Sequence, residues 1–352
     1  MKILMYTDVH FSTYSSILRR RGKKYSIRLE NMINSLNWVE KLGETEHCDR
    51  VITLGDFFDT PTLNDEELTA LQDVVWNKLP HTFIVGNHES SVNGLRYSST
   101  KALENLGFDV ISSPCFEPLD SETDLVFIPY LIEDDRRPFA SYVREGHKSI
   151  VLSHNDIKGI RYGRFVSENG FLLDEIEENC DLFINGHLHN GCFLNDKETI
   201  LNLGNLTGQN FTEDAWNHSH LAVILDTETM SLEFFENPYA FNFYQITVEK
   251  EIQIKKMYAM KKNSVVTFKC VESLVEKLRQ EVEDNPNIVE YRILSIPDVE
   301  ELESGDTIKE SLAKTNYLEQ FIEFTTEKLG NSKLLREELQ QVCQEGGLSN
   351  EA

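Results

Sequence analysis

The feature that most constrains this chain is a short pattern that occurs six times: a run of strand-forming residues that ends in a side chain able to bind metal. Its clearest copy is the run over residues 50–54, followed by Gly-Asp-Phe-Phe-Asp over residues 55–59. Such a run closed by Gly-Asp predicts a buried strand with a carboxylate at its carboxyl end. The other copies end in Asp8-Val9-His10, Gly86-Asn87-His88-Glu89, Ser153-His154-Asn155, Gly186-His187-Leu188-His189 and Gly204-Asn205.

These strand ends are expected to meet at one place. In an open α/β sheet the ligand site lies in the crevice beyond the carboxyl ends of the strands. Residues two apart at a strand end point to the same side, so Asp8 pairs with His10 and His187 pairs with His189. The pattern therefore predicts one site built from Asp, His and Asn side chains that lie far apart in the sequence.

The predicted donor set points to divalent metals. Imidazole, carboxylate and amide donors together suit manganese, iron or zinc better than calcium. Two such ions about 3.5–4 Å apart clamp a phosphate and lower the pKa of a water between them. Asp56 has two oxygens and can bridge the ions, while His88, oriented by Glu89, is the natural proton donor to the leaving oxygen. Asp59 is expected to cap the next turn or to support a ligand from behind.

Helical periodicity between these strands predicts the other layers of an α/β domain. One helix is expected over residues 26–42, with Gly43 as its C′ residue. A second helix follows Asn64, which is a good N-cap before an acidic first turn. Residues 220–225 and 232–235 predict a hairpin. Strands and helices that alternate in this way predict a layered domain with two sheets.

The character of the chain changes near residue 238. Residues 265–296 predict a compact strand–helix–strand unit, and an acidic segment and two helical stretches follow it. The apolar stripe with Leu318 and Phe321 follows the acidic segment, so we expect it to bind a partner rather than to fold back on the chain. The predicted division is residues 1–240, a capping domain at 241–297, a linker at 298–306 and a helical region at 307–352.

The charge balance bears on possible substrates. With 34 basic and 59 acidic residues, the chain has a formal net charge of −25 and is poorly equipped to hold DNA unaided. A basic run nevertheless follows the first motif, and two arginines follow His154. We expect these side chains to contact a DNA backbone, or else to belong to ordinary solvated loops: Arg19, Arg20, Arg21, Arg161 and Arg164.

Cysteine usage and hydropathy indicate where the protein works. The 6 cysteines are scattered and form no Cys-x-x-Cys pair, which is typical of reduced thiols. The sequence has no apolar run of membrane-spanning length and no signal-peptide segment at its start. A cytoplasmic protein without a membrane span is therefore expected.

In their order along the chain, the motifs resemble the calcineurin-like metallophosphoesterase family. Asp-x-His, Gly-Asp-x-x-Asp, Gly-Asn-His-Glu, a lone His after a strand and Gly-His-x-His span residues 8–189. The resemblance implies a two-sheet αββα sandwich with a small α/β capping domain and C-terminal helices. It also implies one metal held by Asp8, His10, Asp56 and His189, another held by Asp56, Asn87, His154 and His187, and His88 as the catalytic histidine.

Within that family, residues 55–61 are most similar to the DNA-repair nuclease branch. That branch comprises the nuclease subunit of SbcCD-type double-strand-break complexes and its phage relatives. Phosphoprotein phosphatases carry Gly-Asp-x-Val-Asp-Arg-Gly, which Phe58, Thr60 and Pro61 do not match. The chain departs from the usual pattern at Phe11-Ser12, where Leu-Gly is common, and at Glu89, where the branch has Asp.

The resemblance to this branch implies a DNA exonuclease or endonuclease with two divalent ions, most readily manganese. Its implied partners are DNA, a coiled-coil ATPase of the SbcC type and a second copy of the chain, in the cytoplasm of a bacterium or infected host. Two alternatives remain: a metallophosphatase or phosphodiesterase acting on nucleotides or phosphoproteins, and a metal-stabilised scaffold that binds the partner.

Overall fold

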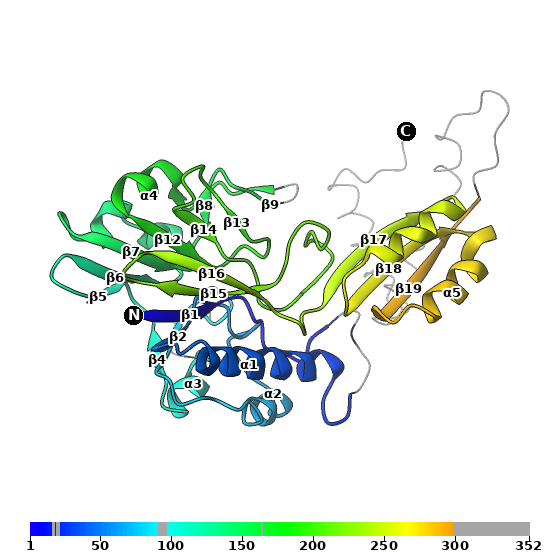
Figure 1. Cartoon of the computed structure of the whole chain (residues 1–352), viewed down its shortest axis with the longest axis horizontal. Helices are drawn as coiled ribbons and strands as arrows, with labels where there is room; N and C mark the ends of the chain where they lie inside the picture. The colour runs from blue at the N-terminus through cyan, green and yellow to red at the C-terminus, as the bar shows by residue number, and fades with distance from the viewer. Residues whose placement is uncertain (16–17, 19–21, 91–96, 163–164, 299–352) are drawn as a thin grey trace, which may run out of the picture. The chain divides into compact units, whose positions relative to one another are not determined.

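The structure, a computed structural model, describes residues 1–15, 18, 22–90, 97–162 and 165–298 (Figure 1). The chain divides into two compact units, Met1–Pro297 and Asp298–Ala352. Asp298 is described, but the rest of the expected linker and the whole helical region over residues 307–352 lie outside the described residues. Within the described part, no helix combines the length and the apolarity that crossing a bilayer requires.

Two six-stranded sheets form the body of the first unit. The first contains β1 (Lys2–Tyr6), β2 (Arg50–Thr53), β3 (His81–Ile84), β4 (Asp109–Ile111), β15 (Leu221–Asp226) and β16 (Ser231–Glu236), in the order β16-β15-β1-β2-β3-β4. The second contains β5 (Cys115–Pro118), β6 (Thr123–Ile128), β7 (Lys148–Ser153), β12 (Leu182–Asn185), β13 (Cys192–Phe193) and β14 (Ile200–Asn202), in the order β13-β14-β12-β7-β6-β5. The strands that precede the motifs are parallel within each sheet.

Alternation of side chains along β1 explains how the layers stack. Ile3 and Met5 pack with Leu152 of β7 in the core between the two sheets, whereas Leu4 packs with Leu29 of α1 (Ile27–Thr45). Figure 1 shows α1 with α2 (Asp65–Leu71) and α3 (Lys101–Asn105) outside the first sheet, and α4 (Leu173–Asn179) outside the second. These layers form the αββα sandwich that the resemblance implies, and they confirm the predicted two-sheet domain.

Side-chain caps mark the N-termini of α1 and α2, the two longer helices outside the first sheet. The side chain of Ser26 caps α1, and Asn64 and Glu67 form a reciprocal capping box at the start of α2. The expectation that Gly43 ends the first helix is wrong, because α1 continues to Thr45. A Cβ at residue 43 would lie 3.2 Å from a Leu79 methyl carbon, so this glycine allows close packing instead.

A third sheet and several short elements complete the described residues. The sheet is parallel, with β17 (Asn242–Val248), β18 (Ser264–Val271) and β19 (Ile288–Ile296), and α5 (Val275–Glu283) connects the last two strands. The short strands are β8 (Ile157–Lys158), β9 (Arg161–Tyr162), β10 (Phe165–Val166) and β11 (Phe171–Leu172). The 3-10 helices are η1 (Glu133–Asp135), η2 (Phe139–Tyr142), η3 (Glu251–Ala259) and η4 (Glu272–Leu274).

Candidate metal centre

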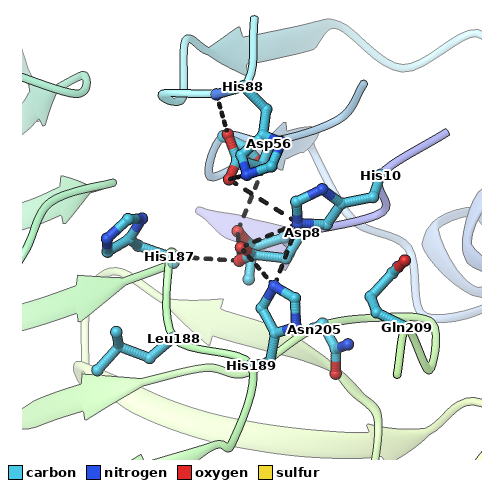
Figure 2. A network of polar contacts seen from close by, with 12 residues as sticks. Asp8, His10, Asp56, His88, His187, Leu188, His189, Asn205 and Gln209 are labelled. Carbon is cyan, nitrogen blue, oxygen red and sulfur yellow. Dashed lines mark hydrogen bonds and ion pairs between the residues drawn. The ribbon is translucent and has the colours of Figure 1, made fainter. Parts of the chain in front are cut away.

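The carboxyl ends of five parallel strands, three from the first sheet and two from the second, place the seven expected ligands around one point. Asp8 and His10 follow β1, Asp56 follows β2, Asn87 follows β3, His154 follows β7, and His187 and His189 follow β12. The loops of the two sheets touch directly, because the backbone N–H of His187 donates to Asp8 Oδ2 over 2.9 Å (Figure 2).

The donor atoms form overlapping groups around Asp56. Three sets of side chains each have ligand atoms within 4.8 Å of one another: Asp8, His10 and His189; His10, Asp56 and His88; and Asp56, His154 and His187. Asp56 Oδ2 lies 3.8 Å from His10 Nε2 and 3.1 Å from His154 Nε2. One carboxylate therefore faces both halves of the cluster, as a ligand that bridges two ions must.

Asn87 joins the half of the cluster that contains His154 and His187. Its Oδ1 lies 3.0 Å from His187 Nδ1 and 3.3 Å from His154 Nε2. At the other half, His189 Nε2 lies 3.2 Å from His10 Nε2 (Figure 2). The side chains thus lie in two neighbouring groups that share Asp56, one with His10 and His189 and the other with Asn87, His154 and His187.

The environment of Asp8 tests whether these residues fit a metal ion. Asp8 is fully buried, and its Oδ2 accepts hydrogen bonds from Thr7 Oγ1 and from the His187 backbone. No hydrogen bond reaches its Oδ1 from any described residue. A buried carboxylate oxygen without a donor is costly. A cation at the centre of the cluster would satisfy it, so the donor set fits divalent metal.

Each histidine among the expected ligands uses only one ring nitrogen toward the cluster. The other nitrogen is held by an oxygen: His10 Nδ1 by Asp59 Oδ1 at 3.0 Å, His189 Nδ1 by Glu213 Oε1 at 3.1 Å, His187 Nε2 by Asp156 Oδ1 at 3.2 Å and His154 Nδ1 by the Leu54 carbonyl at 2.6 Å. Oxygens in these positions fix the tautomer and the orientation of metal-binding imidazoles.

The sequence prediction missed two of the carboxylates that hold these rings. Asp156 stands two residues after His154, the spacing that pairs Asp8 with His10, so the same rule applied once more would have found it. Glu213 lies in a loop with no pattern that marks it. Asn205 was expected at a sixth strand end, but its side chain donates to Glu213 and lies behind His189 rather than among the ligands (Figure 2).

The backbone is strained where it presents these ligands. Four of the eight non-glycine residues with positive φ in the described part of the chain belong to the cluster: Asp8, His10, Asp56 and His187. The left-handed conformation costs a residue with a Cβ about 1–2 kcal/mol. Such strain concentrates at functional sites, where the surrounding structure holds it in place.

Glycines precede the ligands because a Cβ would collide with the cluster. A Cβ at Gly55 would lie 2.3 Å from His154 Nδ1, and one at Gly186 would lie 2.2 Å from Thr7 Oγ1. At Gly86 the nearest atom would be Asp56 Oδ1, also at 2.2 Å. The glycines of Gly-Asp, Gly-Asn-His and Gly-His-x-His thus let neighbouring loops approach closely.

Contrary to the expectation from the sequence, Glu89 does not orient His88 but connects two loops of the cluster. Its buried carboxylate accepts hydrogen bonds from the backbone N–H groups of Phe58 and Gly86, at 3.0 and 2.7 Å, and so joins the loops that carry Asp56 and Asn87. The His88 ring is instead held by the Asp59 carbonyl, 2.9 Å from His88 Nδ1. A glutamate that bonds to two backbone groups is not free to orient the neighbouring ring.

Electrostatics in the cluster favour positive charge at its centre. Burial would lower the pKa of His10, but Asp59, Asp8 and Asp56 raise it to about 10. The pKa of His154 is raised to about 9, against burial, mainly by Asp56. Ligation requires neutral imidazoles, so a cation bound here would take the place of these protons. Burial, reinforced by the charge of Asp56, raises the pKa of Glu89 to about 7.

The arginines expected to contact DNA are only partly described. Arg161 is exposed on β9. Arg19, Arg20, Arg21 and Arg164 lie outside the described residues.

Several solved structures are similar to part of this chain. No curated protein sequence matches the chain significantly. Similar solved structures, each covering 67% of this chain, include a novel archaeal phosphodiesterase (14% identity, 99% of that chain, TM-score 0.36), a dimetal phosphatase from Danio rerio (13%, 98%, 0.38) and the phosphoesterase Yfce from E. coli (14%, 100%, 0.32). Likenesses at these scores carry no argument about the substrate.

The sequence model of one family, described as calcineurin-like phosphoesterase, matches residues 1–191 of 352. This match includes β1, β2, β3, β7 and β12 and all seven side chains of the cluster. Members of that family hydrolyse phosphoesters with a dimetal centre. The chain belongs to the calcineurin-like phosphoesterase family.

Proposed function

We propose that this phosphoesterase cleaves phosphodiester bonds in DNA with two divalent ions, most readily manganese, as the nuclease subunit of an ATPase–nuclease complex. One ion would be held by Asp8, His10, Asp56 and His189, and the other by Asp56, Asn87, His154 and His187. Divalent ions supply Lewis acidity toward a phosphoryl oxygen and acidify a water molecule. The protein contributes the fixed orientation of these donors and a place for the proton of the leaving group.

His88 is the residue suited to that proton transfer. Its Nδ1 is held by the Asp59 carbonyl, which leaves Nε2 on the side of the cluster, 4.0 Å from Asp56 Oδ2. The side chain is 40% exposed, so it can reach a substrate that enters from solvent. A histidine in this position passes a proton from Nε2 to the leaving oxygen.

The observation that favours DNA over a small phosphoester is a lysine-rich surface in an otherwise acidic chain. Residues 250–269 contain six lysines and one acidic residue, whereas the whole chain has 34 basic and 59 acidic residues. Five of these lysines are exposed: Lys250, Lys255, Lys256, Lys262 and Lys269. Clustered lysines bind the phosphates of nucleic acids by releasing counterions.

An aromatic side chain lines the same cavity as one of these lysines, Lys256. Trp216 is 45% exposed, and its ring packs edge-on against Tyr244 of β17 with 4.6 Å between centroids. A cavity of about 480 Å³ is lined by this tryptophan together with Gln245, Thr247 and Lys256. Aromatic rings next to cations are typical of surfaces on which unpaired bases stack. Lysines and tryptophan together support a nucleic-acid substrate.

The second candidate is a phosphatase or phosphodiesterase that acts on nucleotides or phosphoproteins. The metal-binding donors fit this activity equally well, since they recognise only the phosphate. The sequence of the loop after β2 disfavours a phosphoprotein phosphatase activity, because Thr60 and Pro61 stand where those enzymes carry Arg-Gly.

Turnover in manganese separates the candidates. We expect the protein to degrade linear DNA and to hydrolyse bis(p-nitrophenyl) phosphate faster than p-nitrophenyl phosphate. Hydrolysis of the monoester alone would refute the nuclease proposal. A double variant, Lys255→Glu with Lys256→Glu, should weaken DNA binding and flatten its salt dependence without changing hydrolysis of the small diester. The control is Lys148→Glu, an exposed lysine at the amino end of β7, away from the cluster.

The proposed partner is a coiled-coil ATPase of the SbcC type, with a second copy of the chain in the same complex. Support comes from the sequence of residues 307–352 and its apolar stripe. Because the lysine-rich surface is small, an ATPase subunit would supply most of the affinity for DNA. Copurification of the full chain with such a subunit tests the proposal, and its failure at micromolar concentrations would contradict it.

A further inference from the structure

A buried polar network lies behind His189, at the ring nitrogen that faces away from His10. Glu213, 9% exposed, is at its centre. Its Oε1 accepts hydrogen bonds from His189 Nδ1 at 3.1 Å, from Asn205 Nδ2 at 2.9 Å and from the Gln209 backbone N–H at 3.0 Å. The carboxylate is thus fixed by two donors besides the histidine it holds.

The nearby buried guanidinium of Arg28 connects this network to the loop after β1. Arg28 is 4% exposed, and its Nη2 donates to Gln209 Oε1. Gln209 Nε2 in turn donates to the carbonyl of Val9 over 2.9 Å. Val9 lies between Asp8 and His10, so the Arg28–Gln209 contact reaches the backbone that carries two ligands of one metal position.

Charge balance explains why a guanidinium is buried here. Burial lowers the pKa of Arg28, and the charges of Asp59 and Glu213 oppose that change. Asp59 holds His10, and Glu213 holds His189. The positive charge of Arg28 is therefore attracted by both carboxylates that hold the histidines of one metal position.

We propose that Arg28 and Glu213 are positioning residues for the metal position formed by Asp8, His10, Asp56 and His189. The inference rests on the dimetal function proposed above. Glu213 holds the proton of His189 on Nδ1 and leaves the Nε2 lone pair for the ion. Arg28 holds Gln209, which bonds to the backbone between Asp8 and His10. The position with Asn87, His154 and His187 has no contact with this pair.

The expected signature is therefore asymmetric. Mutation of a group that holds a metal-binding histidine lowers metal affinity about 10–100-fold. A change at Glu213 or Arg28 should produce this loss at one position and leave the other within about twofold of its original affinity. A residue that only stabilised the fold would weaken both positions together.

Manganese titration of the full chain tests the proposal. Binding is followed by calorimetry and by the electron paramagnetic resonance signal of coupled manganese pairs, while circular dichroism checks the fold. Glu213→Gln keeps the oxygen that faces His189 but removes its charge, and Arg28→Met removes the compensating cation. Arg28→Lys keeps a positive charge and should restore much of the affinity. The matched control is Glu177→Gln, which changes a carboxylate on α4 that pairs with Lys197.

The possible results divide cleanly. Wild-type protein that binds two ions, together with Glu213→Gln and Arg28→Met variants that each lose one position, would support the proposal. Unchanged affinity at both positions, or an equal loss at both, would overturn it while the dimetal function stood. Wild-type protein that binds fewer than two ions would overturn the dimetal function and this inference with it.

Discussion

Replacing Gly86 by alanine tests whether close packing around Asp56 keeps the metal-binding residues in place. A Cβ at residue 86 would lie 2.2 Å from Asp56 Oδ1 and 2.4 Å from the Asp56 backbone nitrogen. Favourable contacts between non-bonded heavy atoms begin at about 3.5 Å, so the two loops must separate by about 1 Å. Rotation of the side chain cannot relieve the contact with a backbone atom. Gly86 is not among the residues with positive φ, so the effect is steric.

The shift acts on the carboxylate that faces both metal positions, and this sets the expected magnitude. A misplacement of about 1 Å in a preorganised site can cost about 10²-fold in rate. We therefore expect Gly86→Ala to hydrolyse bis(p-nitrophenyl) phosphate in manganese about 100-fold more slowly than the wild type. Metal content, measured by inductively coupled plasma mass spectrometry after gel filtration, should fall as well.

Gly107→Ala is the control for this experiment. Gly107 has a φ of +87° and nothing within 4 Å of an added Cβ. Alanine there should cost about 1–2 kcal/mol of stability through backbone strain and leave turnover unchanged. Wild-type turnover in Gly86→Ala would refute the reasoning, because Asp56 could then move without consequence. Equal losses in both variants would attribute the effect to stability alone.

Three further changes probe separate parts of the proposal. His88→Ala should retain metal but lose about 10²–10⁴-fold in turnover, since it removes only the proton donor; a near-normal rate would exclude that role. Asp56→Asn should lower metal content at both positions, which mass analysis measures, and unchanged content would contradict a bridging carboxylate. Deletion of residues 307–352 should abolish copurification with the ATPase subunit and preserve hydrolysis of the small diester; a complex that survives would refute the docking assignment.

The sequence predicts the sandwich and the cluster because both are encoded locally. Each apolar run can be recognised by itself as a strand. Because these strands are parallel within each sheet, the polar residues at their carboxyl ends come together in the cluster. Asp8, Asp56 and His154 can therefore be grouped from the amino-acid sequence alone. The capping box at Asn64 is equally local, since its two partners stand three residues apart.

Features that depend on tertiary contact could not be predicted in this way. Glycine is typical of a helix end, but Gly43 lies inside α1, where the absence of a side chain leaves room for Leu79. The side chain of Glu89 bonds to backbone groups that only folding brings near it. Glu213 meets His189 through a loop without periodicity, and β17 was not expected because its neighbours in the third sheet come later in the chain.

Each half of the cluster draws its side chains from both sheets, with Asp56 on one side of the sandwich and His154 or His189 on the other. An ion bound in either half would thus connect the two sheets at the carboxyl ends of their parallel strands. An ion present at 100 times its dissociation constant adds about 2.7 kcal/mol to the free energy of unfolding. Chelators should therefore weaken the contact between the two sheets as well as stop hydrolysis. The temperature of thermal unfolding would then report how much metal is bound to the protein.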